Sequence, residues 1–471
     1  MTGSRPNRLS DLLRAEDSSR PDIASELLSE SQGEHSAAPA EDKGLDESLR
    51  QILEEPRTIE DTGLSQGFLN DLTLKTLYFG GAMLGARIAQ SLHLYFSGVV
   101  EPVLRGLKAE HLVEVTGGSA LSPASYHYTI TSKGSERARE LLERNRYVGP
   151  CPVSLEQYTQ VIEAQAQIRP WVTDENVREA LKGLILADDV IENIGPAINV
   201  HEAIFIYGPP GNGKSSIAKA IGNGLLPGNV MIPYAIHEDG QIIKVFDPTT
   251  HQAIGGEAAQ LAETDYLDKR WVRCKPPIVI TGGELTLSDL NLVWSDTSRF
   301  YEAPFQMKAN GGMLVIDDFG RQQMSPAELL NRWIVPLEEK VDYLTFYTGK
   351  KFSVPFELLI VFSTNLDPKS LVDEAFLRRI SHKLGIYDPS ETQYYQIFTT
   401  ASEARGLEFN EEAYTYLLQK YYHDMDRPLR ACHPRDLIKQ MAMMSKYRGK
   451  PSIMTKELVD QAARTYFADF L

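Results

Sequence analysis

One octapeptide, GPPGNGKS at Gly208–Ser215, constrains the fold of this 471-residue chain more than any other feature. It follows the short apolar run AIFIY and precedes the helical pattern SSIAKAIGNGL. Its glycines allow the backbone to curl so that N–H groups face an anion, and the positive end of the following helix points at the same place. The spacing G-x-x-x-x-G-K-[ST] between a strand and a helix therefore predicts a phosphate-binding loop in an α/β domain with a mainly parallel sheet.

The residues of this loop have separate expected roles. Lys214 is expected to reach the β- and γ-phosphates of a nucleotide, and the Ser215 hydroxyl to coordinate Mg²⁺. The expected nucleotide contacts are Gly208, Pro209, Pro210, Gly211, Asn212, Gly213, Lys214, Ser215 and Ser216.

Two later apolar strands end in polar side chains that suit the same site. MLVIDD ends in Asp317, expected to hold Mg²⁺ through water, and Asp318, expected to act as a base or to polarise water. LLIVFSTN ends in Asn365, whose amide can hydrogen-bond the attacking water and the γ-phosphate. The alternative for the acids is a strand followed by an ordinary acidic turn, which the upstream phosphate loop disfavours.

Three arginines complete the series. DEAFLRRI contains Arg378 and Arg379, and CHPRDLIKQM places Arg435 at the start of a predicted helix. Taken singly, such arginines are usually solvated surface residues. In this order after the other motifs, however, the five elements resemble the AAA+ ATPase family over about residues 170–471.

The resemblance implies a role for each motif. The octapeptide corresponds to the family's Walker A motif, Leu314–Asp318 to Walker B and Asn365 to sensor 1. Arg378 or Arg379 corresponds to the arginine finger that acts on a neighbouring protomer, and Arg435 to sensor 2. The family's properties imply ATP and Mg²⁺ as cofactors and a homo-oligomeric, hexameric ring that hydrolyses ATP between protomers. This series disfavours a monomeric P-loop kinase or signalling NTPase.

A predicted hairpin narrows the resemblance. YLTFYT and FSVPF flank Gly349-Lys350 just before the sensor 1 strand, which is similar to MoxR-like ATPases, magnesium chelatase subunits and minichromosome helicases. The segment ANGGMLVIDD also looks MoxR-like, which implies a chaperone-like remodeller with a protein client. Most of the family has Asp-Glu where this chain has Asp317-Asp318, so hydrolysis is expected to be slow.

Two segments between the Walker motifs carry further expectations. GQIIKVFDPTTHQ is expected to form a β-hairpin inserted after the first helix. Gly282–Leu290 is predicted to be a substrate-contact loop facing the pore of the ring, through Glu284 and Leu285. The alternative is a structural turn that is capped by the helix TLSDLNLVW.

Composition divides the chain. Residues 1–62 hold 7 basic and 15 acidic residues and no aromatic one, so we expect a disordered acidic tail. Its amphipathic islands, at Leu9, Leu12, Leu13 and at Leu45, Leu49, Ile52, Leu53, are either docking peptides or transient helices. The expected domains after the tail are a winged-helix domain at 63–147, a linker and helix at 148–169, an AAA+ α/β core at 170–388 and an all-α lid at 389–471.

The winged-helix prediction rests on element order. Residues 64–150 are predicted to form three helices, a two-stranded wing and a helix, and YTITSKGSERARELL resembles the wing segment of bacterial winged-helix proteins. The candidate recognition helix offers Arg105 and Lys108 against Glu101, few cations for a DNA reader. Protein docking is therefore favoured over DNA binding, and an ATP-switched DNA-binding regulator is the alternative function.

Charge and hydropathy exclude other classes. With 48 basic and 64 acidic residues, the formal charge is −16. This charge argues against a chain covered with basic surface for non-specific nucleic-acid binding. No apolar run approaches the roughly 18 residues of a membrane span, and the N-terminus lacks the apolar core of a secretory signal. Cys151, Cys274 and Cys432 are widely spaced, against a disulfide framework or a zinc site. We expect a cytoplasmic protein without a membrane partner.

Overall fold

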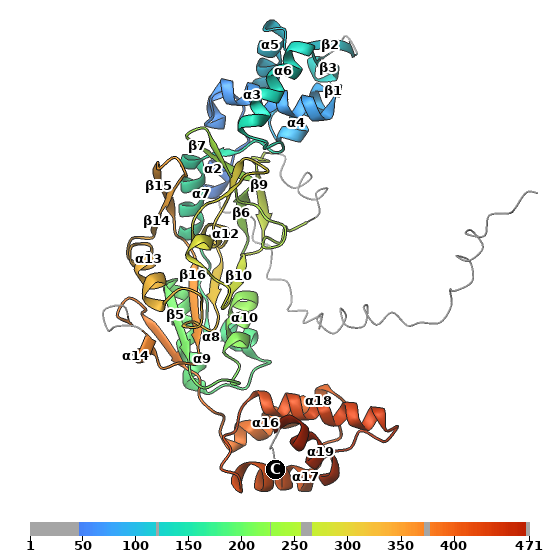
Figure 1. Cartoon of the computed structure of the whole chain (residues 1–471), viewed down its shortest axis with the longest axis vertical. Helices are drawn as coiled ribbons and strands as arrows, with labels where there is room; N and C mark the ends of the chain where they lie inside the picture. Colours follow the sequence, from blue (N-terminus) through green and yellow to red (C-terminus); the bar gives the residue numbers. More distant parts are fainter. Residues whose placement is uncertain (1–46, 119–121, 227, 256–265, 372–376, 468–471) are drawn as a thin grey trace, which may run out of the picture. The chain divides into compact units, whose positions relative to one another are not determined.

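The computed structural model describes residues 47–118, 122–226, 228–255, 266–371 and 377–467 (Figure 1). All of these residues fall within one compact unit of the chain, Gly44–Leu471. The predictions for Leu9, Leu12, Leu13 and Leu45 lie outside the described residues. Within the described residues, no helix is both long and apolar enough to cross a membrane.

The N-terminal domain consists of helices around a small antiparallel sheet of order β1-β3-β2. Its elements are α3 (Gln66–Gly80), β1 (Met83–Leu84), α4 (Gly85–Leu92), the π-helical turn η2 (Phe96–Val100), α5 (Glu101–Ala109), β2 (Val113–Gly118), β3 (Tyr126–Ile130) and α6 (Ser132–Arg144). The three predicted helices, two strands and final helix are therefore present, with β1 as an additional short strand. Apolar residues of α3, α4 and α5, among them Leu77, Ile88 and Leu104, form the core.

The prediction of a disordered tail is wrong for residues 47–62. These residues form α2 (Glu47–Ile52) and the 3₁₀ turn η1 (Glu60–Thr62). Leu49 and Leu53 are 1% and 0% exposed and pack into a core with residues of α7 (Leu155–Gln167). The segment is acidic, but its leucines lie on one helical face that a distant part of the chain covers.

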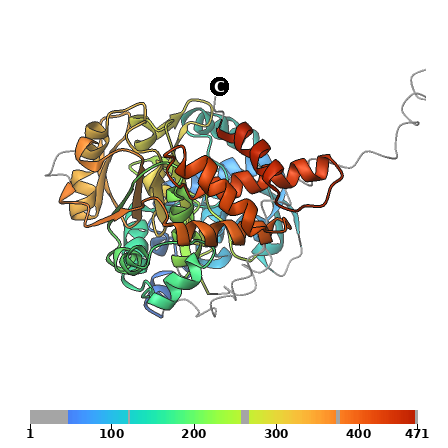
Figure 2. The same cartoon turned by 90° about the horizontal axis from the view of Figure 1, so that it is seen from below.

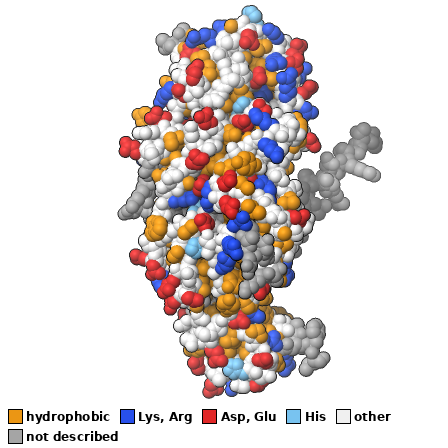
Figure 3. All heavy atoms as spheres, turned by 90° about the vertical axis from the view of Figure 1, so that its left-hand side faces the viewer, with side chains coloured by type: hydrophobic (Ala, Val, Ile, Leu, Met, Phe, Trp, Pro, Cys, Tyr) orange, Lys and Arg blue, Asp and Glu red, His pale blue; other side chains and the backbone are white. Residues whose placement is uncertain are grey.

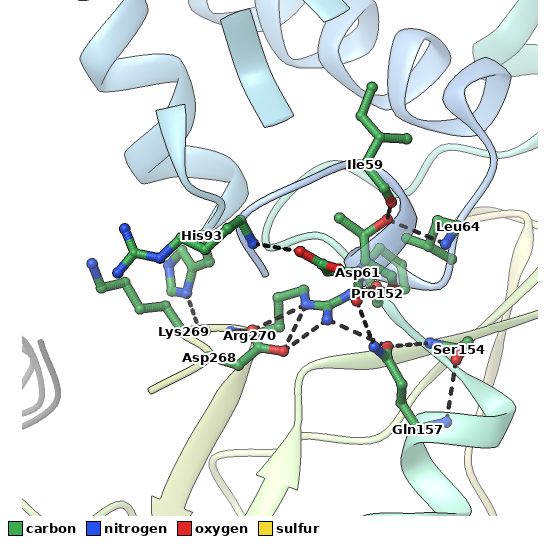
Figure 4. A network of polar contacts seen from close by, with 12 residues as sticks. Ile59, Asp61, Leu64, His93, Pro152, Ser154, Gln157, Asp268, Lys269 and Arg270 are labelled. Atoms are coloured by element: carbon green, nitrogen blue, oxygen red, sulfur yellow. Dashed lines mark hydrogen bonds and ion pairs between the residues drawn. The ribbon is translucent and has the colours of Figure 1, made fainter. Parts of the chain in front are cut away.

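A buried arginine fastens this segment to the rest of the molecule (Figure 4). Arg270 is 1% exposed, and its Nη2 lies 2.7 Å from Asp268 Oδ2. Its Nη1 donates to the carbonyl oxygens of Thr62 (2.9 Å) and Pro152 (3.2 Å), and Nη2 also donates to Gln157 Oε1 (3.3 Å). Three stretches far apart in sequence therefore meet at one side chain.

The central sheet is parallel and has the strand order β10-β13-β16-β5-β17. Its strands are β10 (Ile278–Thr281), β13 (Met313–Ile316), β16 (Leu359–Thr364), β5 (Ala203–Tyr207) and β17 (His382–Gly385). Four of the five β5 residues are buried, as expected for a strand covered on both faces. This confirms the predicted α/β core with a parallel sheet.

Helices cover both faces of this sheet. Ile204 and Ile206 of β5 pack with α8 (Asp174–Leu181), α9 (Asp188–Val200) and α10 (Lys214–Leu225). Phe205, which points to the opposite face, packs with α13 (Pro326–Glu339). Figure 1 shows α10 and α13 on opposite sides of β16.

The sequence did not predict a second, mixed sheet, which combines one strand before the phosphate loop with four strands between that loop and Asp317. Its order is β11-β12-β8-β7-β4. Its strands are β11 (Val293–Ser295), β12 (Phe300–Glu302), β8 (Gln241–Lys244), β7 (Ala235–Glu238) and β4 (Val153–Ser154), and a separate pair joins β6 (Val230–Pro233) to β9 (Trp271–Cys274). The hairpin expected at GQIIKVFDPTTHQ is instead β7–β8, which turns earlier, at Asp239-Gly240. The bounds of β7 and β8 depend on their pairing with strands that are distant in the sequence, β4 and β12.

The hairpin predicted before Asn365 is present. It consists of β14 (Val341–Thr345) and β15 (Lys351–Pro355), which pair antiparallel and immediately precede β16. Its tip contacts the second sheet, because Tyr347 N–H donates to the Tyr301 hydroxyl at 3.0 Å and the two rings stack.

The C-terminal region is a helical bundle with an aromatic core (Figure 2). Tyr394, Phe398 and Tyr422 are at most 1% exposed. The helices are α16 (Glu391–Ala404), α17 (Glu411–Leu418), the π-helical turn η5 (Gln419–His423), α18 (Cys432–Tyr447) and α19 (Lys456–Phe467).

Candidate nucleotide-binding site

The predicted phosphate loop joins the carboxyl end of β5 to the first residue of α10. Gly208 has φ +136°, and a Cβ there would lie 2.0 Å from the carbonyl oxygen of Ile386. Gly213, with φ +83°, is the N-cap of α10, and apart from its chain neighbours no atom of the described residues lies within 4 Å of where its Cβ would stand. Glycine is thus required for the loop to leave β5 beside the end of β17, and the space beside Gly213 is open.

Lys214 is buried at this loop and held by three acceptors. Its Nζ donates to the carbonyl oxygens of Gly208 and Pro209, both at 2.9 Å, and to Asn365 Oδ1 at 2.5 Å. Burial lowers the pKa of this ammonium, whereas the carboxylates of Asp317 and Asp318 oppose the shift. The predicted phosphate lysine and the predicted sensor amide therefore meet, although they are far apart in sequence.

Ser215 and Asp317 also meet, and together they fit the predicted magnesium ion. The Ser215 hydroxyl donates to Asp317 Oδ2 at 2.6 Å. Mg²⁺ prefers oxygen ligands, one or two carboxylates and the phosphates of a bound substrate, with water in the remaining positions. One hydroxyl and one carboxylate beside a phosphate loop match that donor set. Across the described residues, no group of three or more His, Cys, Asp and Glu side chains is placed to hold a metal on its own.

Asp318 completes this cluster. Its Oδ1 accepts from Asn365 Nδ2 at 3.0 Å, and its backbone φ is +50°, in the left-handed region. The structure thus brings Lys214, Asn365 and Asp318 into one bonded chain. Because the strands are parallel, their carboxyl ends lie along one edge of the sheet, which is why residues that follow three strands converge.

The three predicted arginines lie on other parts of the chain, two of them between β16 and β17 and the third in the first turn of α18. Arg378 is exposed, and Arg379 Nε lies 2.6 Å from Glu338 Oε1, at the end of α13. Arg435 has a side chain that is 65% exposed and pairs with Asp436 at 3.2 Å. Their roles in a neighbouring site or in nucleotide sensing stay predictions.

Sequence reasoning missed a second cation and its carboxylate. Arg430 Nη1 lies 2.6 Å from Asp388 Oδ1, which also accepts from Asn212 Nδ2 at 2.7 Å. The N–H of Ala431 donates to Asn212 Oδ1, and that of Cys432 donates to the Gly211 carbonyl oxygen. The predicted loop residue Asn212 therefore links the loop to the start of α18. Arg430 stands five residues before Arg435, but no local pattern distinguished it.

The prediction that Gly282–Leu290 contacts a substrate through Leu285 is wrong, because this side chain is buried. Leu285 is fully buried in the core beneath the sheet, and Glu284 Oε1 accepts from the Gly282 N–H at 2.9 Å. Thr286 and Asp289 form a capping box for the 3₁₀ turn η4 (Leu287–Leu290). The segment is a structural turn at Leu285, because an apolar side chain there packs inward instead of facing a substrate.

Comparisons with known proteins found one family model that matches the C-terminal helices and solved structures of low sequence identity. A domain of unknown function, DUF8689, matches residues 390–465, and no curated protein matches the sequence. NtrX from Brucella abortus in complex with ADP is 14% identical over 69% of this chain and 57% of that one, with a TM-score of 0.35. The Thermotoga maritima RuvB Holliday junction branch migration motor is 12% identical over 69% of this chain and 73% of that one, with a TM-score of 0.33. The chain thus spans just over half of NtrX.

The chain's own geometry carries the conclusion. A five-stranded parallel sheet places Gly208–Ser215 between β5 and α10. Asp317, Asp318 and Asn365 follow the neighbouring strands and bond to the loop or to one another. We conclude that the described part of the α/β core carries a phosphate-loop turn whose lysine and serine form one polar cluster with the acids and the amide that follow β13 and β16.

Proposed function

We propose that this chain is an AAA+ ATPase that binds ATP with Mg²⁺ and hydrolyses it in a homo-oligomeric, hexameric ring. The observation that carries the proposal is the bonded chain Lys214–Asn365–Asp318 beside the phosphate loop. A cation, a neutral amide and a carboxylate at the carboxyl edge of a parallel sheet are the groups that phosphate-anhydride hydrolysis requires.

Each residue has a role in that reaction. Lys214 exchanges its carbonyl partners for the β- and γ-phosphate oxygens, and Ser215 and Asp317 would hold Mg²⁺. The bound ion supplies positive charge that neutralises the phosphate oxygens. Asn365 orients the attacking water, and Asp318 accepts its proton. The short Asp318 side chain supports slow turnover.

The neighbouring protomer completes the site in this proposal. Arg378 or Arg379 enters the adjacent nucleotide site, where an arginine of this kind accelerates hydrolysis by roughly 10³–10⁵-fold. Arg378 is exposed and available for such a contact, whereas Arg379 must first exchange Glu338. Arg435 couples the C-terminal helices, as a lid, to the γ-phosphate.

We further propose a MoxR-like, chaperone-like remodeller that acts on a protein client in the cytoplasm. The hairpin β14–β15 before Asn365 supports this branch, and residues 63–147 serve as a protein-docking winged-helix domain. The alternative is an ATP-switched DNA-binding regulator. It is weakened because Arg105, one of the two cations on the candidate recognition helix, pairs with Glu101 at 2.9 Å. Acidic and basic side chains are interspersed on the face shown in Figure 3.

Concentration-dependent ATPase measurements test the proposal. We expect the activity of the parent chain to rise with protein concentration and Lys214→Ala to lose it. Mixing Lys214→Ala with Arg379→Ala is expected to restore part of the activity, because each supplies what the other lacks. Activity that is independent of concentration, with Arg379→Ala and Arg378→Ala unimpaired, would refute the shared site. Stimulation by duplex DNA would favour the regulator.

A further inference from the structure

The turn after β13 has an unusual backbone at the proposed base. Asp318 has φ +50° and Gly320 has φ +98°, so two residues of a short turn lie in the left-handed region. Asp adopts this conformation more readily than most side chains, because its short polar group tolerates the crowding. The left-handed backbone therefore gives a physical reason for an Asp where the resembling family usually has Glu.

The end of the neighbouring strand β16 anchors one part of this turn. Phe319 N–H donates to the Ser363 carbonyl oxygen at 2.7 Å, and the Thr364 hydroxyl donates to the Phe319 carbonyl oxygen, also at 2.7 Å. The Phe319 side chain is fully buried. These contacts fix the residue after Asp318. Other bonds reach the residues before it, since Asp317 N–H donates to the Thr281 carbonyl oxygen at 2.8 Å, Asp318 N–H to Asp317 Oδ1 at 3.1 Å, and Arg321 N–H to the Asp318 carbonyl oxygen at 3.0 Å.

The amide of Gln322 adds three bonds to the backbone of Asp317, Asp318 and Gly320. Its Oε1 accepts from Gly320 N–H at 2.8 Å. Its Nε2 donates to the carbonyl oxygens of Asp317 at 3.0 Å and Asp318 at 3.2 Å. Gln322 is partly buried, and its recorded bonds go to backbone atoms of this turn and, at 3.5 Å, to the Gly282 carbonyl oxygen. One side chain thus ties together the backbone on both sides of the Asp318 Cα.

We propose that Gln322 is a positioning residue for the reaction, which it serves by holding Asp318 in the left-handed conformation. The inference rests on the proposed hydrolysis of ATP by this site. Without the amide, the turn relaxes toward negative φ and the Asp318 carboxylate moves away from Asn365. A displacement of about 1 Å in a catalytic group can cost about 100-fold in rate. Because Gln322 does not bond to the phosphate loop, ATP affinity is expected to persist.

The test separates turnover from binding. Gln322→Met keeps the length of the side chain and removes its hydrogen bonds. Gln323→Met is the matched control, because Gln323 is the adjacent residue and its side chain is exposed. For Gln322→Met we expect kcat to fall by about 10–100-fold, with the affinity for a fluorescent ATP analogue unchanged within about twofold. Gln323→Met should match the parent in both.

A second comparison distinguishes positioning from a general loss of structure. In an Asp318→Asn background, measured by single turnover of radiolabelled ATP, adding Gln322→Met should change the rate by less than about twofold, because Gln322 acts through the carboxylate. Parent-like kcat in Gln322→Met, an equal loss of ATP affinity, or the same fold loss in the Asp318→Asn background would overturn the inference. A parent chain that binds but never hydrolyses ATP would instead refute the proposed function.

Discussion

Removing the buried guanidinium of Arg270 is expected to loosen the junction in Figure 4. In Arg270→Met, Asp268 loses the guanidinium, its side-chain donor among the described residues, and retains the Arg270 backbone N–H, at 3.0 Å; in the parent it is 5% exposed. The carbonyl oxygens of Thr62 and Pro152 also lose their shared donor. The variant therefore buries a carboxylate without a counter-charge and leaves two buried acceptors unpaired.

The loss of unfolding free energy can be worked out from the unpaired carboxylate and the two unpaired carbonyl oxygens. Removing one partner of a buried ion pair costs about 3–5 kcal/mol, most of it the desolvation of the charge that stays behind. The two unpaired carbonyls place Arg270→Met near the upper end of that range. Asp268→Asn combined with Arg270→Met should recover at least about 1 kcal/mol of the loss, because the neutral amide carries no charge to desolvate.

Denaturant unfolding of the full chain measures the free energy, and limited proteolysis locates the change. We expect faster cleavage within residues 53–64, since the Thr62 carbonyl is released. Lys269→Met is the control, because Lys269 is partly exposed and its partner Glu55, 3.3 Å away, also pairs with Arg57 at 3.4 Å. A loss below about 1 kcal/mol in Arg270→Met, or a double variant less stable than Arg270→Met, would refute the reasoning.

Two further predictions concern other parts of the chain. Leu53→Ala should lower the free energy of unfolding by about 2–5 kcal/mol because Leu53 is fully buried, whereas Ile52→Ala, at 44% exposure, should stay within about 0.5 kcal/mol of the parent by denaturant unfolding. Burial lowers the pKa of His433 to about 4, with Arg427 and Arg430 adding to the shift, so the unfolded chain binds the extra proton as pH falls. The stability of the C-terminal helices should therefore fall between about pH 6.5 and 4, by about 1–2 kcal/mol because solvent screens the partly exposed imidazole. Hydrogen exchange in α18, corrected for intrinsic rates, should show this slope in the parent but not in His433→Gln.

Local patterns sufficed for the residues that bind to one another at the sheet edge. Lys214, Asp317 and Asn365 each follow or begin an element whose type the sequence predicts. Their convergence needs no further information, because parallel strands place their carboxyl ends along one edge. The octapeptide and the strand ends therefore anticipated the core of the candidate site.

Long-range pairing explains what the sequence did not anticipate. The tail segment is acidic, yet Leu49 and Leu53 are covered by a helix about 100 residues away. Leu285 looks like any loop residue, and its burial depends on the core beneath it. The second sheet joins β4 to strands after residue 230, a combination that no local periodicity encodes.

Local sequence patterns were enough to predict the phosphate loop, the acids and the amide that follow the strands, and the α/β class. Which side chains support these residues depends on contacts that form only in the folded chain. Arg430 meets Asp388 and Asn212, and Gln322 binds the backbone around Asp318, through contacts whose partners depend on folding. The physical reason is that a strand or a phosphate loop is set by neighbours in the chain, whereas a single hydrogen-bonding side chain takes its role from whatever folding brings beside it.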